Sequence, residues 1–206
     1  MTHEEMDIES ALRSRAISGD EVAAAARRLA RRAEAEGLVD VAYSDVDTPV
    51  GNLVVASTRR GLVRVSFGPE PRDRVLEELA EDVSPRMIES PGRLDDVRRQ
   101  LDDYFEGRRN EFDLTLDWQL SRGFSRRVLE QTYRIPFGEV STYREMAAAA
   151  GSPRGARAAG NALGGNPIPI VVPCHRVLHS GGGIGGYGGG LDRKRFLLRL
   201  EGAMKS

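Results

Sequence analysis

From about Val41 onward, strand-like segments come before helix-like segments, and this order constrains the fold more than any other feature. Three early segments combine β-branched residues with alternating apolar positions: Val41–Ser44, Leu53–Ser57 and Gly61–Phe67. A turn signal, Pro49–Asn52, separates the first two. Two helical stretches, Asp73–Asp82 and Asp95–Phe105, come next. Strands followed by helices, without alternation of the two, predict a small α+β domain over residues 39–118.

After Gly123 the pattern becomes mainly helical. Three helices are expected there, at Ser125–Arg134, Tyr143–Ala150 and Arg154–Leu163. The second opens on a capping box made by Thr142 and Glu145, and Ser152 is the expected N-cap of the third. Two short helices joined by a tight turn that contains glycine indicate a helix-turn-helix. Residues 119–206 are therefore predicted to form a second, mostly helical domain.

Residues 1–38 precede both domains and are polar. Ser18 and Glu21 form a capping-box pattern before an Ala/Arg/Glu-rich run, and Gly37 suits the C-terminal end of that helix. We interpret this segment as a helical extension that packs on the surface of the body. Docking of its small apolar stripe on another chain is the alternative. The sequence assigns the segment no function.

Basic residues are concentrated in the second half of the chain. The net charge is −1, but residues 121–206 hold 13 Lys and Arg against 5 Asp and Glu, and the rest holds 17 against 26. This asymmetry is typical of a chain in which one half meets a polyanion such as a nucleic acid. The alternative is a solvated basic face.

The third expected helix is built almost wholly from Gly and Ala, with Arg154 and Arg157 projecting. A helix without bulky side chains can approach the narrow minor groove of DNA, and an arginine suits that groove. Small residues are equally useful in a tightly packed core helix, which is the other interpretation.

Cys174 is the only cysteine, and it stands directly beside His175, one of three histidines. A thiol needs a nearby base or positive field to become a thiolate, so the pair indicates a nucleophile. A buried cysteine that acts as a small apolar residue is the alternative. The preceding run, Asn166–Val172, predicts an asparagine turn that leads into a buried apolar strand and fixes the position of the thiol.

Two features after the cysteine fit the same chemistry. Gly181–Gly190 forms a loop nearly free of side chains, which permits close approach to a ligand, and its Tyr187 can wall a pocket for a planar base. Glu201 ends a C-terminal helix among apolar residues. A carboxylate that orients a histidine beside a nucleophile is the general arrangement of a catalytic triad. A charge on the helix surface is the alternative for Glu201.

The composition excludes several classes of protein. One cysteine cannot form an internal disulfide, and no metal site is expected, since only three histidines accompany it: His3, His175 and His179. No apolar run approaches the roughly 20 residues that cross a bilayer. The acidic start contains no secretory signal. A reduced cytoplasmic setting without membrane association is expected.

The stretch from Asn166 to Val177, Asn-Pro-Ile-Pro-Ile-Val-Val-Pro-Cys-His-Arg-Val, resembles the O6-alkylguanine-DNA alkyltransferase family. Four further features follow the cysteine at the spacings of that family: Gly186-Tyr187, Lys194, Leu197-Leu198 and Glu201. The resemblance covers about Val41 to Gly202. It implies a ribonuclease H-like first domain and a winged helix-turn-helix-like second domain.

The activity implied by this resemblance is that of a methylated-DNA–[protein]-cysteine S-methyltransferase. Such a protein repairs DNA by taking the alkyl group of O6-alkylguanine once and irreversibly, without a cofactor, and O4-alkylthymine is a second substrate hypothesis. The resemblance implies that Cys174 accepts the alkyl group, that Glu201 polarises His175, and that His175 deprotonates Cys174 through water. Tyr143 would assist the departing guanine, and Asn166 would tie the helix-turn-helix to the active-site turn. The carbonyls of Cys174 and Val177 would read the guanine, and Tyr187 would line the base pocket.

The resemblance also implies a monomer that binds double-stranded DNA through the minor groove. Arg157 would fill the gap that a flipped nucleotide leaves, since the target atom is hidden inside the duplex. Four residues fall where relatives contact the DNA backbone: Ser125, Arg144, Ser152 and Ser180.

Three features depart from common family patterns. Gly188 stands where some relatives have serine, Arg144 stands where glutamine is common, and the N-terminal zinc site of some relatives has no cysteines here. The competing hypotheses are a lesion-binding sensor without transfer, a cysteine hydrolase with a Cys-His-Glu triad, and a methyl-sensing transcription regulator. The presence of Cys174 opposes the first and the arginine-bearing helix opposes the second. The lack of a cysteine-rich module opposes the third.

Overall fold

The computed structural model describes residues 18–68 and 70–204, and it divides the chain into two units, residues 1–39 and 40–206. The described part of the first unit is helix α2 (Gly19–Ala35). Ser18 Oγ accepts a hydrogen bond from the Glu21 N–H, and the Glu21 carboxylate accepts one from the Ser18 N–H, so the expected capping box is present. Gly37 follows the helix with a φ of 73°. Predictions for residues 1–17, including His3, lie outside the described residues.

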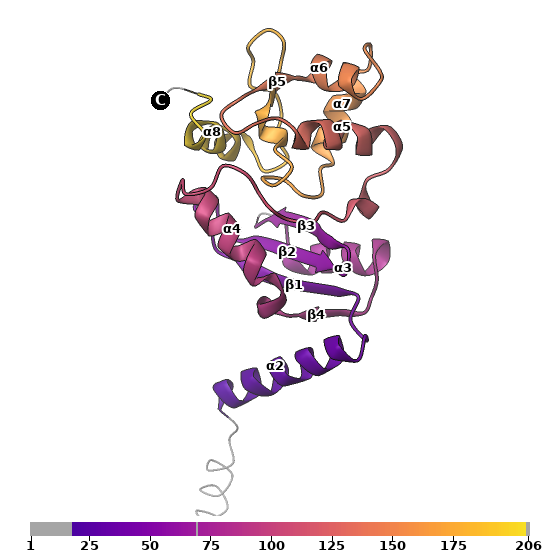
Figure 1. Cartoon of the computed structure of the whole chain (residues 1–206), viewed down its shortest axis with the longest axis vertical. Helices are drawn as coiled ribbons and strands as arrows, with labels where there is room; N and C mark the ends of the chain where they lie inside the picture. The colour runs from indigo at the N-terminus through magenta and orange to yellow at the C-terminus, as the bar shows by residue number, and fades with distance from the viewer. Residues whose placement is uncertain (1–17, 69, 205–206) are drawn as a thin grey trace, which may run out of the picture. The chain divides into compact units, whose positions relative to one another are not determined.

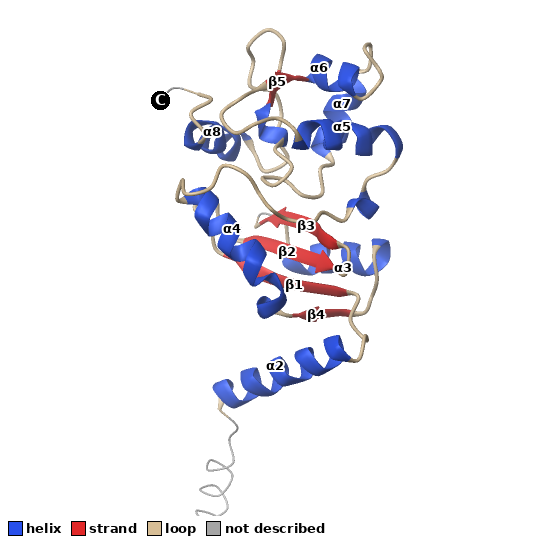
Figure 2. Cartoon of the chain, in the orientation of Figure 1, coloured by secondary structure: helices blue, strands red, loops and turns tan. Residues whose placement is uncertain are grey.

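A four-stranded sheet forms the first part of the second unit (Figures 1 and 2). Its strands are β1 (Val41–Val46), β2 (Leu53–Thr58), β3 (Gly61–Phe67) and β4 (Met87–Glu89), in the order β3-β2-β1-β4. The first three are antiparallel neighbours and confirm the predicted strands. β4 runs parallel to β1 and was not expected, because it has only three residues and none of them is fully buried.

Helices cover both faces of this sheet. α3 (Arg72–Asp82) packs Val75 and Leu79 against one face, with Val41, Val54 and Val63 from the strands. On the other face lie the short 3₁₀ turn η1 (Pro91–Leu94), which was not predicted, and α4 (Asp95–Phe105), which begins and ends where the sequence predicted a helix. The chain then leaves this sheet domain through η2 (Trp118–Leu120).

The second part of the unit is mostly helical, as predicted. Its elements are α5 (Gly123–Tyr133), β5 (Ser141–Thr142), α6 (Tyr143–Ala149), α7 (Ala156–Gly164), η3 (Cys174–Arg176), β6 (Val177–Leu178) and α8 (Leu191–Leu200). The capping box of Thr142 and Glu145 opens α6. β5 and β6 pair in parallel, and this pairing brings the start of α6 beside the segment that follows Cys174.

The predicted start of α7 is wrong. Ser152 makes no side-chain cap, and the helix begins at Ala156 with Gly155 in the N-cap position. The Gly155 N–H donates to the Ser152 carbonyl at 2.8 Å, which closes a turn before the helix. The backbone therefore supplies the local hydrogen bond that we expected from the serine side chain.

The predicted strand at Asn166–Val172 is also wrong. Ile170 has a φ of 74°, in the left-handed region that β-branched residues avoid, and the Val172 N–H donates back to the Ile168 carbonyl at 2.8 Å. The run is therefore a folded loop. It is apolar because it is enclosed between the sheet domain and the helices, and the Val65 N–H of β3 donates to the Pro167 carbonyl at 2.8 Å.

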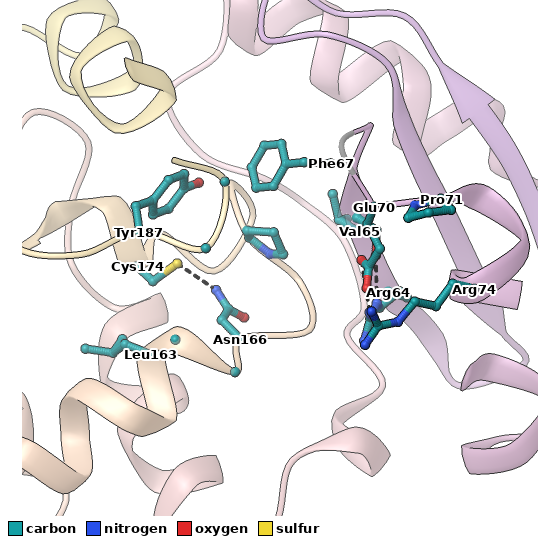
Figure 3. Close-up of a pocket in the computed structure, with 16 residues that line it drawn as sticks. Arg64, Val65, Phe67, Glu70, Pro71, Arg74, Leu163, Asn166, Cys174 and Tyr187 are labelled. Atoms are coloured by element: carbon teal, nitrogen blue, oxygen red, sulfur yellow. Dashed lines mark hydrogen bonds and ion pairs between the residues drawn. The ribbon is translucent and has the colours of Figure 1, made fainter. Parts of the chain in front are cut away.

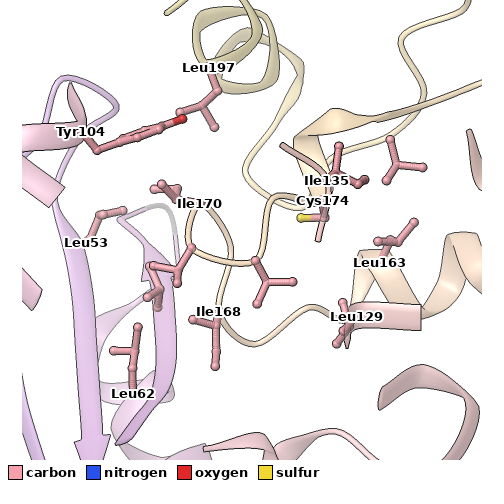
Figure 4. Packing of buried hydrophobic residues seen from close by; sticks show 14 of the residues in the cluster. Leu53, Leu62, Tyr104, Leu129, Ile135, Leu163, Ile168, Ile170, Cys174 and Leu197 are labelled. Carbon is pink, nitrogen blue, oxygen red and sulfur yellow. The ribbon is translucent and has the colours of Figure 1, made fainter. Parts of the chain in front are cut away.

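A single hydrophobic cluster continues from the sheet domain into the helical domain (Figure 4). Leu53, Leu62 and Tyr104 belong to the sheet domain, and Leu129 and Leu197 belong to the helices. The folded loop before Cys174 lies between these two groups, so the reactive segment is part of a continuous core. Within the described residues, no helix combines the length and apolar character needed to cross a membrane.

A substitution at Gly61, the first residue of β3, tests this packing. Its φ is +133°, and a Cβ there would lie 2.2 Å from the Thr115 carbonyl oxygen. We expect Gly61→Ala to lower the free energy of unfolding by at least about 2 kcal/mol, because strain and a backbone clash act together. Gly92→Ala is the control, since a Cβ at Gly92 meets nothing within 4 Å. Equal urea midpoints for the two variants would contradict this account.

Candidate functional site

Cys174 lies in the η3 turn and is a buried free thiol, 6% exposed. Burial raises the pKa of this thiol to about 11, although the Asn166 side chain, the Lys194 charge and nearby backbone N–H groups oppose the rise. The resting residue is therefore a protonated thiol at neutral pH. A nucleophilic role requires a base that removes the proton when the substrate is present.

Asn166 holds the thiol and the loop before it. Its Nδ2 donates to the Cys174 Sγ at 3.1 Å and to the Val172 carbonyl at 2.8 Å, and its Oδ1 accepts from the Ile168 N–H at 3.0 Å (Figure 3). The expected asparagine turn is thus present. One side chain connects the end of α7, the folded loop and the nucleophile.

Glu201 accepts hydrogen bonds from three side chains behind the thiol. His175 Nε2 lies 2.9 Å from Oε1, Tyr104 donates its hydroxyl to Oε1 at 2.6 Å, and Arg176 donates to both carboxylate oxygens at 2.8 Å. Burial alone would raise the pKa of Glu201, but the bonds from His175 and Arg176 hold it at about 2. With 5% exposure, Glu201 is not the surface charge of the alternative interpretation.

His175 has the geometry of a base. Burial lowers its pKa against the opposing effect of Glu201, so the imidazole is neutral. Because a carboxylate only accepts, Nε2 carries the proton and Nδ1 is left as an acceptor. Nδ1 is buried and has no partner in the described part of the chain. Cys174 and His175 are consecutive in a 3₁₀ turn.

Tyr143 and Arg157 line a cavity of about 670 Å³ together with Cys174 and Tyr187. Gly185, with a φ of +71°, leaves room for the Tyr143 ring, since a Cβ at Gly185 would lie 2.5 Å from the Tyr143 hydroxyl oxygen. Burial raises the pKa of Tyr143, and its hydroxyl lies 3.5 Å from the Gly186 carbonyl. The cavity is therefore walled by two aromatic rings and reaches the thiol, and a cavity of this volume holds a small planar ligand.

A second cavity of about 480 Å³ meets the thiol from the sheet domain (Figure 3). Arg64, Glu70 and Arg74 line its far wall. Tyr187 forms part of the near wall, and its ring meets Phe67 of β3 edge to face with 5.7 Å between centroids. The sheet domain thus supports the aromatic wall of the predicted base pocket.

Val177 is buried at the start of β6, and its carbonyl accepts from Lys194 Nζ at 2.7 Å. The Cys174 carbonyl accepts from the Val177 N–H. Both carbonyls expected to read the guanine therefore already have one partner, and each retains a second lone pair. Lys194 also donates to the Gly186 carbonyl at 3.2 Å, and burial lowers its pKa to about 8.

The five candidate DNA contacts come from five segments of the helical domain. Ser125 on α5, Arg144 on α6, Arg157 on α7 and Ser180 after β6 are exposed, whereas Ser152 is half-buried in the turn before α7. Of these five, Arg157 alone lines a cavity that contains Cys174. The other four lie outside both cavities described above.

Sequence reasoning missed Tyr104, Arg176 and the contacts of Lys194. Arg176 is a basic residue inside the buried run around Cys174, and this position was a usable signal, because a buried guanidinium requires a carboxylate partner. Tyr104 lies 97 residues before its partner Glu201, and no local pattern relates the two. Among the described residues, no group of three or more His, Cys, Asp or Glu side chains is arranged to hold a metal ion.

Comparisons with known proteins identify the family. Residues 41–118 match the 6-O-methylguanine DNA methyltransferase ribonuclease-like domain, and residues 123–203 match the DNA-binding domain of the same family. The methylated-DNA–protein-cysteine methyltransferase of Mycobacterium tuberculosis is 41% identical over 159 residues, which cover 77% of this chain and 91% of that protein. This chain belongs to that family.

Other family members show how far the similarity extends. The Bacillus subtilis constitutive methyltransferase is 36% identical over 160 residues, 77% of this chain and 94% of that protein. The crystal structure of Mycobacterium tuberculosis OGT in complex with DNA has a TM-score of 0.67 and 39% identity, and covers 79% of this chain and 93% of that one. The mixed α+β fold with a helical second domain is thus the fold of this methyltransferase family.

The buried carboxylate of Glu201 leads to a prediction about how the free energy of unfolding depends on pH in acid. Because folding lowers the pKa of Glu201 from 4.5 to about 2, its contribution is present above the unfolded value and is lost as pH falls toward 2. A shift of this size corresponds to on the order of 3 kcal/mol. Glu201→Gln should be less stable than the parent at pH 7, because Arg176 loses its charged partner, and the difference should shrink between about pH 5 and pH 2.

Urea unfolding at several pH values measures this effect, with Glu139→Gln as the control for an exposed glutamate. The control should follow the parent throughout. If the free energy of unfolding of Glu201→Gln falls with pH as steeply as that of the parent, Glu201 is not the group responsible.

Proposed function

We propose that this methyltransferase repairs DNA by moving the alkyl group of O6-alkylguanine to Cys174. The observation that carries this proposal is the position of Cys174, whose thiol borders a cavity of about 670 Å³ with two aromatic walls and adjoins the buried His175–Glu201 pair. Curated relatives named methylated-DNA–protein-cysteine methyltransferase support the reaction. O4-alkylthymine is a second candidate substrate.

The thiol is activated by His175 in this proposal. Neutral His175 takes the Cys174 proton at Nδ1 through a bridging water, and Glu201 stabilises the imidazolium that results. The thiolate then attacks the alkyl carbon, a sulfur–carbon bond forms, and the bond from that carbon to O6 breaks. The electron pair of the broken bond leaves with the guanine.

Tyr143 supplies a proton or hydrogen bond to the departing purine. An anionic purine is a poor leaving group, so a general acid lowers the barrier. The raised pKa of Tyr143 keeps its hydroxyl protonated, and its place in the cavity wall beside Cys174 suits this role. Asn166 keeps Cys174 aligned through its bond to Sγ, and the carbonyls of Cys174 and Val177 read the guanine edge with their remaining lone pairs.

DNA binds through the helix-turn-helix of α6 and α7, with α7 in the minor groove. Arg157 enters the duplex and fills the space of the flipped nucleotide. Ser125, Arg144, Ser152 and Ser180 contact the backbone. The solved complex of Mycobacterium tuberculosis OGT with DNA supports DNA as the partner. We further propose that the protein acts as a monomer in the cytoplasm.

Intact-mass spectrometry after mixing with duplex DNA that contains one O6-methylguanine tests the reaction. The parent should gain one methyl group, mapped to Cys174 and saturating at one equivalent, because a thioether is stable and is not turned over. Cys174→Ala should gain none while it still binds the duplex. An unchanged parent mass with tight lesion binding would instead indicate a sensor, and catalytic turnover would indicate a hydrolase.

Arg157→Ala tests the extrusion role. We expect transfer from duplex DNA to fall at least tenfold, because unstacking a base costs a few kcal/mol, while reaction with free O6-benzylguanine changes little. Arg154→Ala is the matched control, since Arg154 is exposed in the same segment and does not line the cavity. An equal loss on both substrates would show that Arg157 acts on the site itself and not on the duplex.

A further inference from the structure

The active-site carboxylate receives a hydrogen bond from the sheet domain. Tyr104 on α4 is fully buried, and its hydroxyl donates to Glu201 Oε1 at 2.6 Å, across 97 residues of sequence. The helical domain supplies Cys174, His175 and Arg176, and Tyr104 adds a hydrogen bond from the sheet domain to this cluster.

Aromatic packing fixes the ring of Tyr104. Phe105 and Phe112 lie with ring centroids at 5.2 Å, and Phe137 meets the ring edge to face at 6.2 Å. Figure 4 shows the ring directed toward Leu197 on α8. With its ring held on several sides, the hydroxyl has little freedom to leave the carboxylate.

Three donors share one oxygen of Glu201. Oε1 accepts from Tyr104, from His175 Nε2 and from one Arg176 nitrogen, while Oε2 accepts from Arg176 Nε. Each donor to Oε1 withdraws electron density from the atom that must stabilise the His175 imidazolium. The Tyr104 bond is the shortest of the three, and in a buried site its effect is not screened by water.

We propose that Tyr104 is a positioning residue for alkyl transfer, one that orients Glu201 and limits the attraction of Oε1 for the proton of His175. This inference rests on the proposed function, in which His175 must be neutral before it accepts the Cys174 proton. If the Glu201 carboxylate attracted the proton of His175 too strongly, His175 would stay protonated, and a protonated imidazole cannot act as the base.

The charged and titratable groups around His175 and Glu201 come from α4, η3, the glycine loop and α8. They are Tyr104 on α4, Cys174 and Arg176 in η3, Tyr187 in the glycine loop, and Arg193 and Lys194 on α8. Arg176 and Lys194 disfavour a charged His175, and Glu201 favours it. Burial keeps His175 neutral at rest, and in our proposal Tyr104 adds to this by weakening the interaction with Glu201 that favours the charged form.

The test is the pH dependence of methyl transfer from duplex O6-methylguanine by the full chain. Tyr104→Phe keeps the aromatic ring and removes the hydroxyl, which leaves Oε1 a stronger partner for His175. The acid limb of the rate profile should move up by about half a pH unit, and transfer on that limb should slow about threefold. Incorporation of 3-fluorotyrosine at position 104, a stronger donor, should move the limb the opposite way.

Tyr133→Phe is the matched control, because Tyr133 donates its hydroxyl to the Phe112 carbonyl at 3.3 Å, away from Glu201. A merely structural role for Tyr104 would lower the urea midpoint and leave the shape of the pH profile unchanged. A parent that transfers methyl groups together with superimposed profiles for all variants would overturn the inference. A parent that transfers nothing would overturn the proposed function instead.

Discussion

The buried contact between Glu201 and its donors is the interaction on which the rest of the site depends. Two opposite charges, Glu201 and Arg176, lie almost fully inside the protein, where removal from water costs several kcal/mol for each ion. That cost is offset only because both carboxylate oxygens are occupied and Arg176 also donates to the Ile135 carbonyl. The same bonds fix the tautomer of His175 and the end of α8.

At rest, Cys174 and His175 form an uncharged thiol–imidazole pair. Burial raises the pKa of Cys174 and lowers that of His175, so the thiol and the imidazole are both uncharged at rest. A thiol that is used only once benefits from this state, because thiolate character is what makes a cysteine vulnerable to oxidation. In the proposed mechanism, the Cys174 proton moves to His175 only when a substrate is bound.

Local chemistry explains which features could be predicted. The capping boxes at Ser18 and Thr142 involve residues three apart, and α4 begins and ends at the predicted residues because its apolar stripe is periodic. The apolar run at Asn166–Val172 was read as a strand because burial and apolar composition are the same for a core strand and an enclosed loop. Ile170 at a φ of 74° shows that packing between the domains overrode β-propensity there.

The sequence by itself determined the family and pointed to the proposed nucleophile and base, because Cys174, His175 and the residues around them are close in the chain and carry their chemistry in their side chains. It also determined the order of β1, β2 and β3 and of the helices. Only the tertiary structure decided that Glu201 is buried, that Arg176 balances its charge, and that Tyr104 reaches it from the sheet domain. Those facts depend on contacts between residues far apart in the chain, and such contacts exist only once the sheet domain and the helices share one core.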